Sequence, residues 1–256
     1  MPPWKFLDCD AMISASLVPP PAPLATAGDL LREMDRFGID RALVYHYHRS
    51  KSRMNRLTFD DVKTSSRLMP CWALSIAPMT LDEKLEDHVE EMIQAGAKAA
   101  RLVPNSGPTA GPMTLQPFLL GGVFERLNRH RIPLLIPADH FPATVPYGFD
   151  QIHEICGAYP EIPVILLQLR FSTQAQLIAL MRLHSNLYFT ISWFGLFRQV
   201  ESMAKMFGAE RLLYGSGLPV GDPATGIGMV SYGKFTAPEK DLIAGGNLHR
   251  LLKGVR

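Results

Sequence analysis

The sequence predicts a single (β/α)₈ (TIM) barrel, and three observations support this fold. Short apolar stretches alternate with amphipathic segments eight times along the chain. The pattern fills 256 residues, a length typical of such barrels. No low-complexity tract or hinge marks a second unit, so we expect one domain spanning residues 1–256. Right-handed crossovers would bring the C-terminal ends of all strands to one rim.

The first predicted strand, residues 6–13, reads FLDCDAMI and carries two carboxylates. Because strand side chains alternate, we expect Asp8, Asp10 and Met12 on one side. If the strands close into a barrel, Asp10 and Met12 point into the mouth, where such barrels carry out chemistry.

Further strands and helices follow from periodicity and from Gly and Pro positions. Strands are predicted at 41–45, 70–76, 98–103, 133–136, 163–169, 187–193 and 212–216. Helices are predicted at 29–37, 58–68, 81–95, 118–128, 149–158, up to 184 after a cap at Ser172 or Thr173, and at 197–207, 238–244 and 247–252. The Pro-rich segment 14–27 is interpreted either as a loop over the mouth or as a contact in a homo-oligomer. Gly226 and Gly228 are interpreted as an ordinary loop rather than a phosphate site.

Composition narrows the functional classes. A net charge of +2 gives no indication of nucleic acid or a membrane as partner. The three widely spaced cysteines are typical of reduced thiols, which predicts a cytoplasmic protein. We see neither a signal peptide at the start of this sequence nor an apolar run of membrane-spanning length.

Four motifs together resemble the amidohydrolase-related family of TIM-barrel hydrolases and decarboxylases. They are FLDCDAMI at 6–13, ARLVP at 100–104, RLLYGSGLP at 211–219 and GNLHRLL at 246–252. The resemblance covers the whole chain and implies a barrel that normally holds a divalent metal such as zinc.

The resemblance also assigns five metal-ligand positions, and most of them lack a good donor here. These positions carry Asp10, Met12, Pro137, Gln168 and Gly217. Methionine is a weak ligand, and proline and glycine offer no side-chain donor. We therefore expect no cofactor and no standard metal centre. A relocated metal site formed by Asp10, His140 and either His46 or His48 is kept as an alternative.

Asp10 and Arg101 are the first candidates for chemistry without that metal. Asp10 fits a general base, or a structural acid paired with Arg101. Arg101 fits a clamp for a substrate carboxylate or phosphate, or an internal salt bridge to Asp8 or Asp10. Arg170 has the same parity as Gln168 and would add a second positive group for an anionic substrate.

The other candidates are an amide and histidines near strand ends. Gln168 could orient a carbonyl or a water molecule, or be a satisfied core amide. His46 and His48 could shuttle protons or bind substrate, or be simply hydrogen-bonded. His140 follows the fifth strand and is the predicted proton donor.

We therefore expect a hydrolase or lyase acting on a small anionic carbonyl or lactone-type compound without the standard metal. Two alternatives remain at this point. One is a non-catalytic barrel that binds a ligand or serves in an assembly, and the other is an enzyme with relocated metal ligands.

Overall fold

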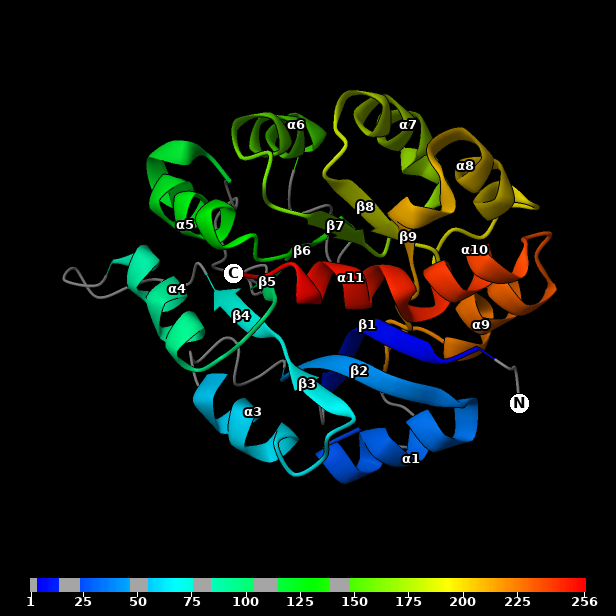
Figure 1. Cartoon of the computed structure of the whole chain (residues 1–256), viewed down its shortest axis with the longest axis horizontal. Helices are drawn as coiled ribbons and strands as arrows, with labels where there is room; N and C mark the ends of the chain where they lie inside the picture. The colour runs from blue at the N-terminus through cyan, green and yellow to red at the C-terminus, as the bar shows by residue number, and fades with distance from the viewer. Residues whose placement is uncertain (1–3, 14–23, 47–54, 76–83, 104–114, 139–147) are drawn as a thin grey trace.

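A computed structural model describes residues 4–13, 24–46, 55–75, 84–103, 115–138 and 148–256, and it forms a closed barrel of parallel strands surrounded by helices (Figure 1). The strand segments are β1 Phe6–Ile13, β2 Ile39–His46, β3 Leu68–Pro70, β4 Trp72–Ser75, β5 Ala100–Val103, β6 Leu134–Pro137, β7 Val164–Leu167, β8 Leu187–Thr190 and β9 Leu212–Leu213. Since β3 and β4 are halves of one barrel strand, the predicted (β/α)₈ fold is confirmed.

The strand 68–75 changes partner halfway along its length. Its first half, β3, pairs with β2, and its second half, β4, pairs with β5. Cys71 lies at the junction and donates its N–H to Val44 O, whereas the N–H of Trp72 goes to Ala99 O. Strands β4–β9 therefore form one continuous sheet, and the hydrogen-bonding partner of the strand 68–75 changes at Cys71.

The barrel closes between β1 and the chain that follows β9. The backbone N–H of Cys9 donates to Tyr214 O at 3.2 Å, and that of Met12 donates to Leu218 O at 3.0 Å. In return, the N–H of Gly217 donates to Asp10 O at 2.9 Å. These bonds satisfy backbone groups that would otherwise lie exposed at two sheet edges.

The helices of the described residues lie mainly outside the barrel. They are α1 Ala27–Phe37, α3 Asn55–Val62, α4 Leu85–Gln94, α5 Pro117–His130, α6 Phe149–Ala158, α7 Gln174–Leu183, α8 Gln199–Phe207, α9 Pro223–Tyr232, α10 Ala237–Asp241 and α11 Asn247–Lys253. In this part of the chain, no helix has both the length and the apolar character required to cross a membrane.

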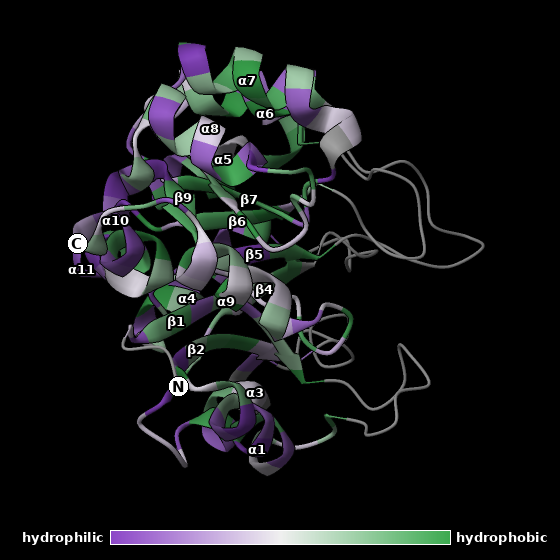
Figure 2. Cartoon of the chain, turned by 90° about the vertical axis from the view of Figure 1, so that its right-hand side faces the viewer, coloured by the Kyte–Doolittle hydropathy of each residue, from purple (hydrophilic) through white to green (hydrophobic). Residues whose placement is uncertain are grey.

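Two apolar layers hold these elements together. An outer layer packs the helices onto the strands, which are largely hydrophobic in Figure 2. An inner layer fills the barrel itself and includes Leu43, Leu135 and Ile165. Helix α11 adds Leu248 and Leu252 to this inner layer, so it covers the end of the barrel where the strands begin.

Strict alternation along β1 was a wrong expectation. The pairing of β1 with β2 shifts between Asp8 and Ala11, which is a β-bulge or a similar irregularity. Leu7, Cys9 and Met12 therefore all pack in the inner layer. Asp8 and Asp10 consequently have different partners instead of forming one row with Met12.

Two helix predictions also need correction. Helix α3 ends at Val62 rather than continuing to residue 68, because residues 68–70 pair as β3. The glycines Gly226 and Gly228 lie in helix α9 and not in a loop. That helix starts with the Asp222 side chain accepting the N–H of Ala224, followed by a proline in its first turn.

Asn247 offers a test of how α11 is attached. Its fully buried amide donates to Ala209 O and Leu212 O, both at 2.8 Å. We expect Asn247→Ala to lower the free energy of unfolding by about 2–4 kcal/mol, since two buried carbonyls lose their donor. Urea unfolding measures this, and His249→Ala at an exposed position of the same helix should change it by less than about 0.5 kcal/mol. Equal effects of the two variants would contradict this role.

Candidate functional site

A buried ion pair joins Asp10 of β1 to Arg101 of β5. Arg101 Nη1 lies 2.5 Å from Asp10 Oδ1, and each side chain is only 3% exposed. Of the two salt bridges considered for Arg101, to Asp8 or to Asp10, the one to Asp10 is present. A charge-assisted bond of this kind fixes both side chains inside the barrel.

Arg101 also contacts the aromatic ring of Tyr45 on β2. Its guanidinium carbon lies 4.1 Å from the ring centroid, a cation–π contact. Burial lowers the pKa of Arg101, whereas the charges of Asp10 and Tyr45 raise it. The raising effects together are larger, so the pKa of Arg101 lies above its ordinary value. Arg101 is therefore a permanent positive charge in the barrel interior. Tyr45 is not among the site residues predicted from the sequence, although alternation along β2 from Leu43 would have placed it on this side of the strand.

Gln168 supplies the second contact to Asp10. Its Nε2 lies 3.3 Å from Asp10 Oδ2, so each carboxylate oxygen has a donor. Gln168 directly follows β7 and has a φ of 56°, in the left-handed region that non-glycine residues rarely adopt. Strained backbone of this kind costs on the order of 1–3 kcal/mol and is common at functional sites. The structure thus brings three predicted site residues together: Asp10, Arg101 and Gln168.

Asp8 has a structural role beside this cluster. Its carboxylate accepts the Ser216 N–H at 2.8 Å, the Ser216 hydroxyl at 2.5 Å and the Asp10 N–H at 2.9 Å. Burial raises the pKa of Asp8 to about 6, although these hydrogen bonds lower it. The Asp8 carboxylate therefore ties β1 to the chain after β9 and holds the backbone that carries Asp10.

Two cysteines lie close to the pair but are poor nucleophiles. Burial raises the pKa of Cys71 to about 12. Burial and the charges of Asp10 and Asp8 raise the pKa of Cys9 well above its ordinary value. Both side chains are therefore protonated thiols at neutral pH, and the thiolate is the reactive form.

The other predicted site residues differ in burial, and two of them lie outside the described residues. His46 ends β2 and is half-buried. Arg170 is exposed, and the left-handed conformation of Gln168 breaks the alternation that had grouped the two side chains. His48 and His140 lie outside the described residues, and so does most of the Pro-rich segment 14–27.

The inherited ligand positions do not fit the metal that the resemblance implies. Asp10 already contacts a guanidinium, which repels a cation, and Met12 packs in the inner apolar layer. At Gly217 an added Cβ would lie 2.8 Å from Trp193 Nε1, so the indole leaves no room for a side-chain ligand. Among the described residues no three His, Cys, Asp or Glu side chains are grouped to hold an ion. The relocated site stays untested, because His140 and His48 lie outside these residues.

The ion pair can be tested by its effect on stability. Arg101→Met should lower the free energy of unfolding by about 3–5 kcal/mol, because it leaves the Asp10 carboxylate buried without a counter-charge. The double variant with Asp10→Asn should be more stable than Arg101→Met alone. Arg126→Met is the control, since its bridge to Glu90 is solvent-exposed and should contribute less than about 1 kcal/mol. Additive effects at Asp10 and Arg101 in denaturant titrations would contradict the coupling.

Asp8 should make stability depend on pH. Folding raises its pKa from 3.8 to about 6, so the folded state holds the proton more tightly between these values. The Asp8 contribution to the free energy of unfolding therefore falls as pH rises from about 4 to about 6, by about 3 kcal/mol. Asp8→Asn lacks this titration. The wild-type value minus the variant value, from urea unfolding at several pH values, should decrease over that range, and a flat difference would exclude a raised pKa.

No protein-family model matches the chain, and no curated protein matches it. An uncharacterised TIM-barrel protein from Bordetella bronchiseptica superimposes with a TM-score of 0.78 at 18% identity, covering 98% of this chain and 99% of that one.

Two further solved structures bear enzyme names. A 2,6-dihydroxybenzoate decarboxylase from Rhizobium gives a TM-score of 0.69 at 13% identity, covering 98% of this chain and 99% of that one. A putative 2-pyrone-4,6-dicarboxylic acid hydrolase from Pseudomonas putida gives 0.67 at 14% identity, covering 98% of both chains. Over essentially its whole length, the chain shares its TIM-barrel fold with these solved structures, and also with one named amidohydrolase II.

Proposed function

We propose that the chain is a hydrolase or lyase for a small anionic carbonyl or lactone-type compound and that it works without the standard metal centre. The observation that carries the proposal is the Asp10–Arg101 pair, in which the carboxylate at the one inherited ligand position with a good donor is already bound to a guanidinium. The names of the structural neighbours, a decarboxylase for a hydroxybenzoate and a hydrolase for a pyrone dicarboxylic acid, support the substrate class.

The guanidinium would replace part of what a metal provides. Arg101 is a fixed positive charge in a water-poor interior, where it stabilises a developing oxyanion or a substrate carboxylate. The Gln168 amide is half-buried and adds a hydrogen-bond donor beside it. Arg170 and His46 would contribute further contacts to an anionic substrate.

In hydrolysis, Asp10 would act as the general base. Water attacks the carbonyl carbon while one of its protons moves to the Asp10 carboxylate, and the carbonyl oxygen takes up negative charge facing Arg101 and Gln168. When the carbonyl re-forms, the bond to the leaving oxygen breaks and that oxygen receives a proton, in our proposal from His140. Substrate binding would have to loosen the Asp10–Arg101 pair, because an ion-paired carboxylate is a weak base.

A non-catalytic ligand-binding barrel is the second candidate. It is favoured by the same pair, since Asp10 is 3% exposed and both of its carboxylate oxygens already have partners. Deep burial and hydrogen bonds to both carboxylate oxygens are expected of an acid with a purely structural role. The two candidates differ in what happens when Asp10 is changed.

A panel of lactones, pyrone carboxylates and hydroxybenzoates, followed by absorbance, tests the proposal. Asp10→Asn should lower kcat for the active substrate by at least about 100-fold, the usual contribution of a general base. Asp60→Asn, at an exposed site on α3, should leave kcat unchanged. Arg101→Lys should raise KM for the anionic substrate more than for its neutral methyl ester.

Metal dependence is measured on the same preparation. Activity should survive dialysis against a chelator and should not rise when Zn²⁺ or Mn²⁺ is added. Activity that disappears on chelation and returns with metal would contradict the metal-free proposal. A wild-type protein that binds one of the panel compounds but turns over none would favour the ligand-binding barrel.

A further inference from the structure

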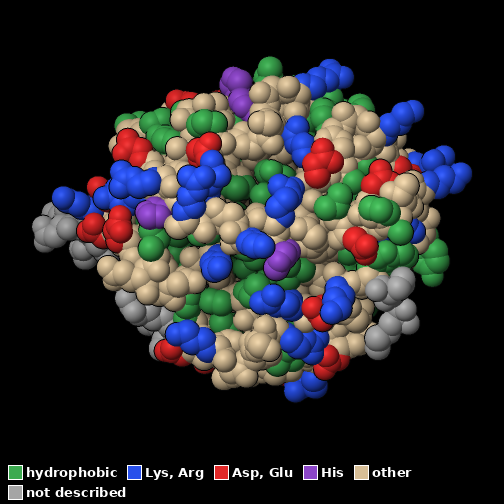
Figure 3. Space-filling view, viewed as in Figure 1, with side chains coloured by type: hydrophobic (Ala, Val, Ile, Leu, Met, Phe, Trp, Pro, Cys, Tyr) green, Lys and Arg blue, Asp and Glu red, His purple; other side chains and the backbone are tan. Residues whose placement is uncertain are grey.

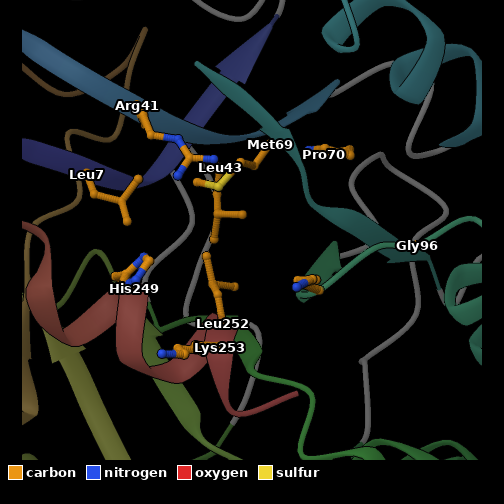
Figure 4. A pocket seen from close by; sticks show the side chains of 10 residues that line it. Leu7, Arg41, Leu43, Met69, Pro70, Gly96, His249, Leu252 and Lys253 are labelled. Atoms are coloured by element: carbon orange, nitrogen blue, oxygen red, sulfur yellow. The ribbon is translucent and has the colours of Figure 1, made fainter. Parts of the chain in front are cut away.

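A pocket of about 360 Å³ opens at the end of the barrel where the strands begin (Figure 4). Neither Asp10 nor Arg101 is among the residues that line it. Its lining comes from the starts of β1 and β2, from β3, from the turn before β5 and from α11. Its volume falls at the lower end of the range found for small-molecule sites. The proposed function above makes no use of this pocket.

The change of partner along the strand 68–75 explains why the pocket exists. Residues 68–70 pair with β2, and pairing with β5 begins only at Trp72. Pro70 has no N–H to offer a neighbouring strand. A gap therefore separates β3 from Lys98 and Gly96 ahead of β5, and α11 lies along it.

The lining combines an apolar floor with a cationic rim. Leu7, Leu43, Met69 and Leu252 form the apolar part. Arg41, Lys98, Lys253 and His249 supply positive or protonatable groups, and no Asp or Glu of the described residues belongs to the lining. Figure 3 shows lysine and arginine side chains gathered on this face of the molecule, around α11.

The Arg41 side chain has a buried N–H donor, at Nε, without a hydrogen-bond acceptor among the described residues. A buried donor without an acceptor is costly, and a cationic one more so. In Figure 4 the Arg41 side chain extends from β2 toward Leu43 and Leu7, at the apolar part of the pocket. A ligand with both an anionic group and an apolar body would satisfy both features.

We propose that this pocket binds a small organic anion with an apolar body, of the kind represented by a medium-chain carboxylate. The carboxylate accepts hydrogen bonds from Arg41 and lies near the charges of Lys98 and Lys253. The hydrocarbon part packs against Leu7, Leu43, Met69 and Leu252. The lining of this pocket does not include Asp10, Arg101 or Gln168, so ligand binding here does not require turnover.

Isothermal titration calorimetry of the full chain with octanoate tests the proposal. Octanoate should bind and raise the Tm, because it binds the folded state alone. Arg41→Gln should weaken binding by about tenfold, the loss of one charge-assisted bond. Lys253→Gln should weaken binding by a smaller factor, because it removes only a nearby positive charge. Met69→Gln should also weaken binding by disturbing the apolar floor. Lys205→Gln, on the exposed surface of α8, is the matched control and should bind like wild type.

Two other ligands and one variant separate the alternatives. Inorganic phosphate and octylammonium should both bind much more weakly than octanoate. Equal binding of phosphate would overturn the need for an apolar body, and equal binding of octylammonium would overturn the need for an anion. Octanoate affinity that is undetectable, or unchanged in both Arg41→Gln and Lys253→Gln, would overturn the site itself. Asp10→Asn should retain octanoate binding. If this variant lost octanoate binding, the ligand would lie at the Asp10–Arg101 pair instead.

Discussion

The closure of the barrel between β1 and the chain after β9 is the constraint on which the candidate site depends. Backbone bonds at Cys9, Met12 and Gly217 make this seam, and the Asp8 carboxylate reinforces it through Ser216. The approach is close: a Cβ on Gly215 would lie 2.9 Å from Thr190 and 3.1 Å from Asp10 Cβ. Glycine is therefore required there, and the seam determines where the Asp10 side chain starts.

With the position of Asp10 fixed in this way, the chemistry available to its carboxylate depends on which cation lies beside it. In this chain the cation is Arg101, buried against Tyr45 and bound to Asp10. A guanidinium is permanently charged and directional, whereas a metal ion also activates a bound water molecule. Chemistry at such a site would depend on positioning and charge stabilisation, with the carboxylate handling the proton. In this respect the proposed site differs from a metal-dependent site of the family that the sequence resembles.

Much of the architecture could be predicted from the sequence. Apolar strands of parallel type and helices of 3.6-residue period carry their own pattern, and helix α6 falls at 149–158 as predicted. The irregular features could not be predicted in this way. The bulge between Asp8 and Ala11 breaks a strict period of two, and the glycines of α9 resemble a loop although Asp222 and Pro223 start a helix.

The candidate site was predictable in part for similar reasons. Asp10, Arg101 and Gln168 could be named from strand position, but the choice between Asp8 and Asp10 as partner of Arg101 depends on how the bulge turns each carboxylate. The φ of 56° at Gln168 interrupts the extended backbone, and side-chain alternation along a strand does not predict such a break before Arg170. The pocket at the other end arises from a sideways shift in strand pairing at Cys71, which hydrophobic patterns do not record.

Helix α11 contributes both to the core and to the pocket, and this affects how the protein can be handled. Leu248 and Leu252 pack inside the barrel, and Leu252 also lines the pocket together with His249 and Lys253. Beyond α11, the Arg256 N–H donates to His130 O at 2.9 Å. A purification tag or fluorescent label attached after Arg256 would therefore sit beside the end of the barrel where the strands begin. A ligand of the basic pocket would therefore meet the tag.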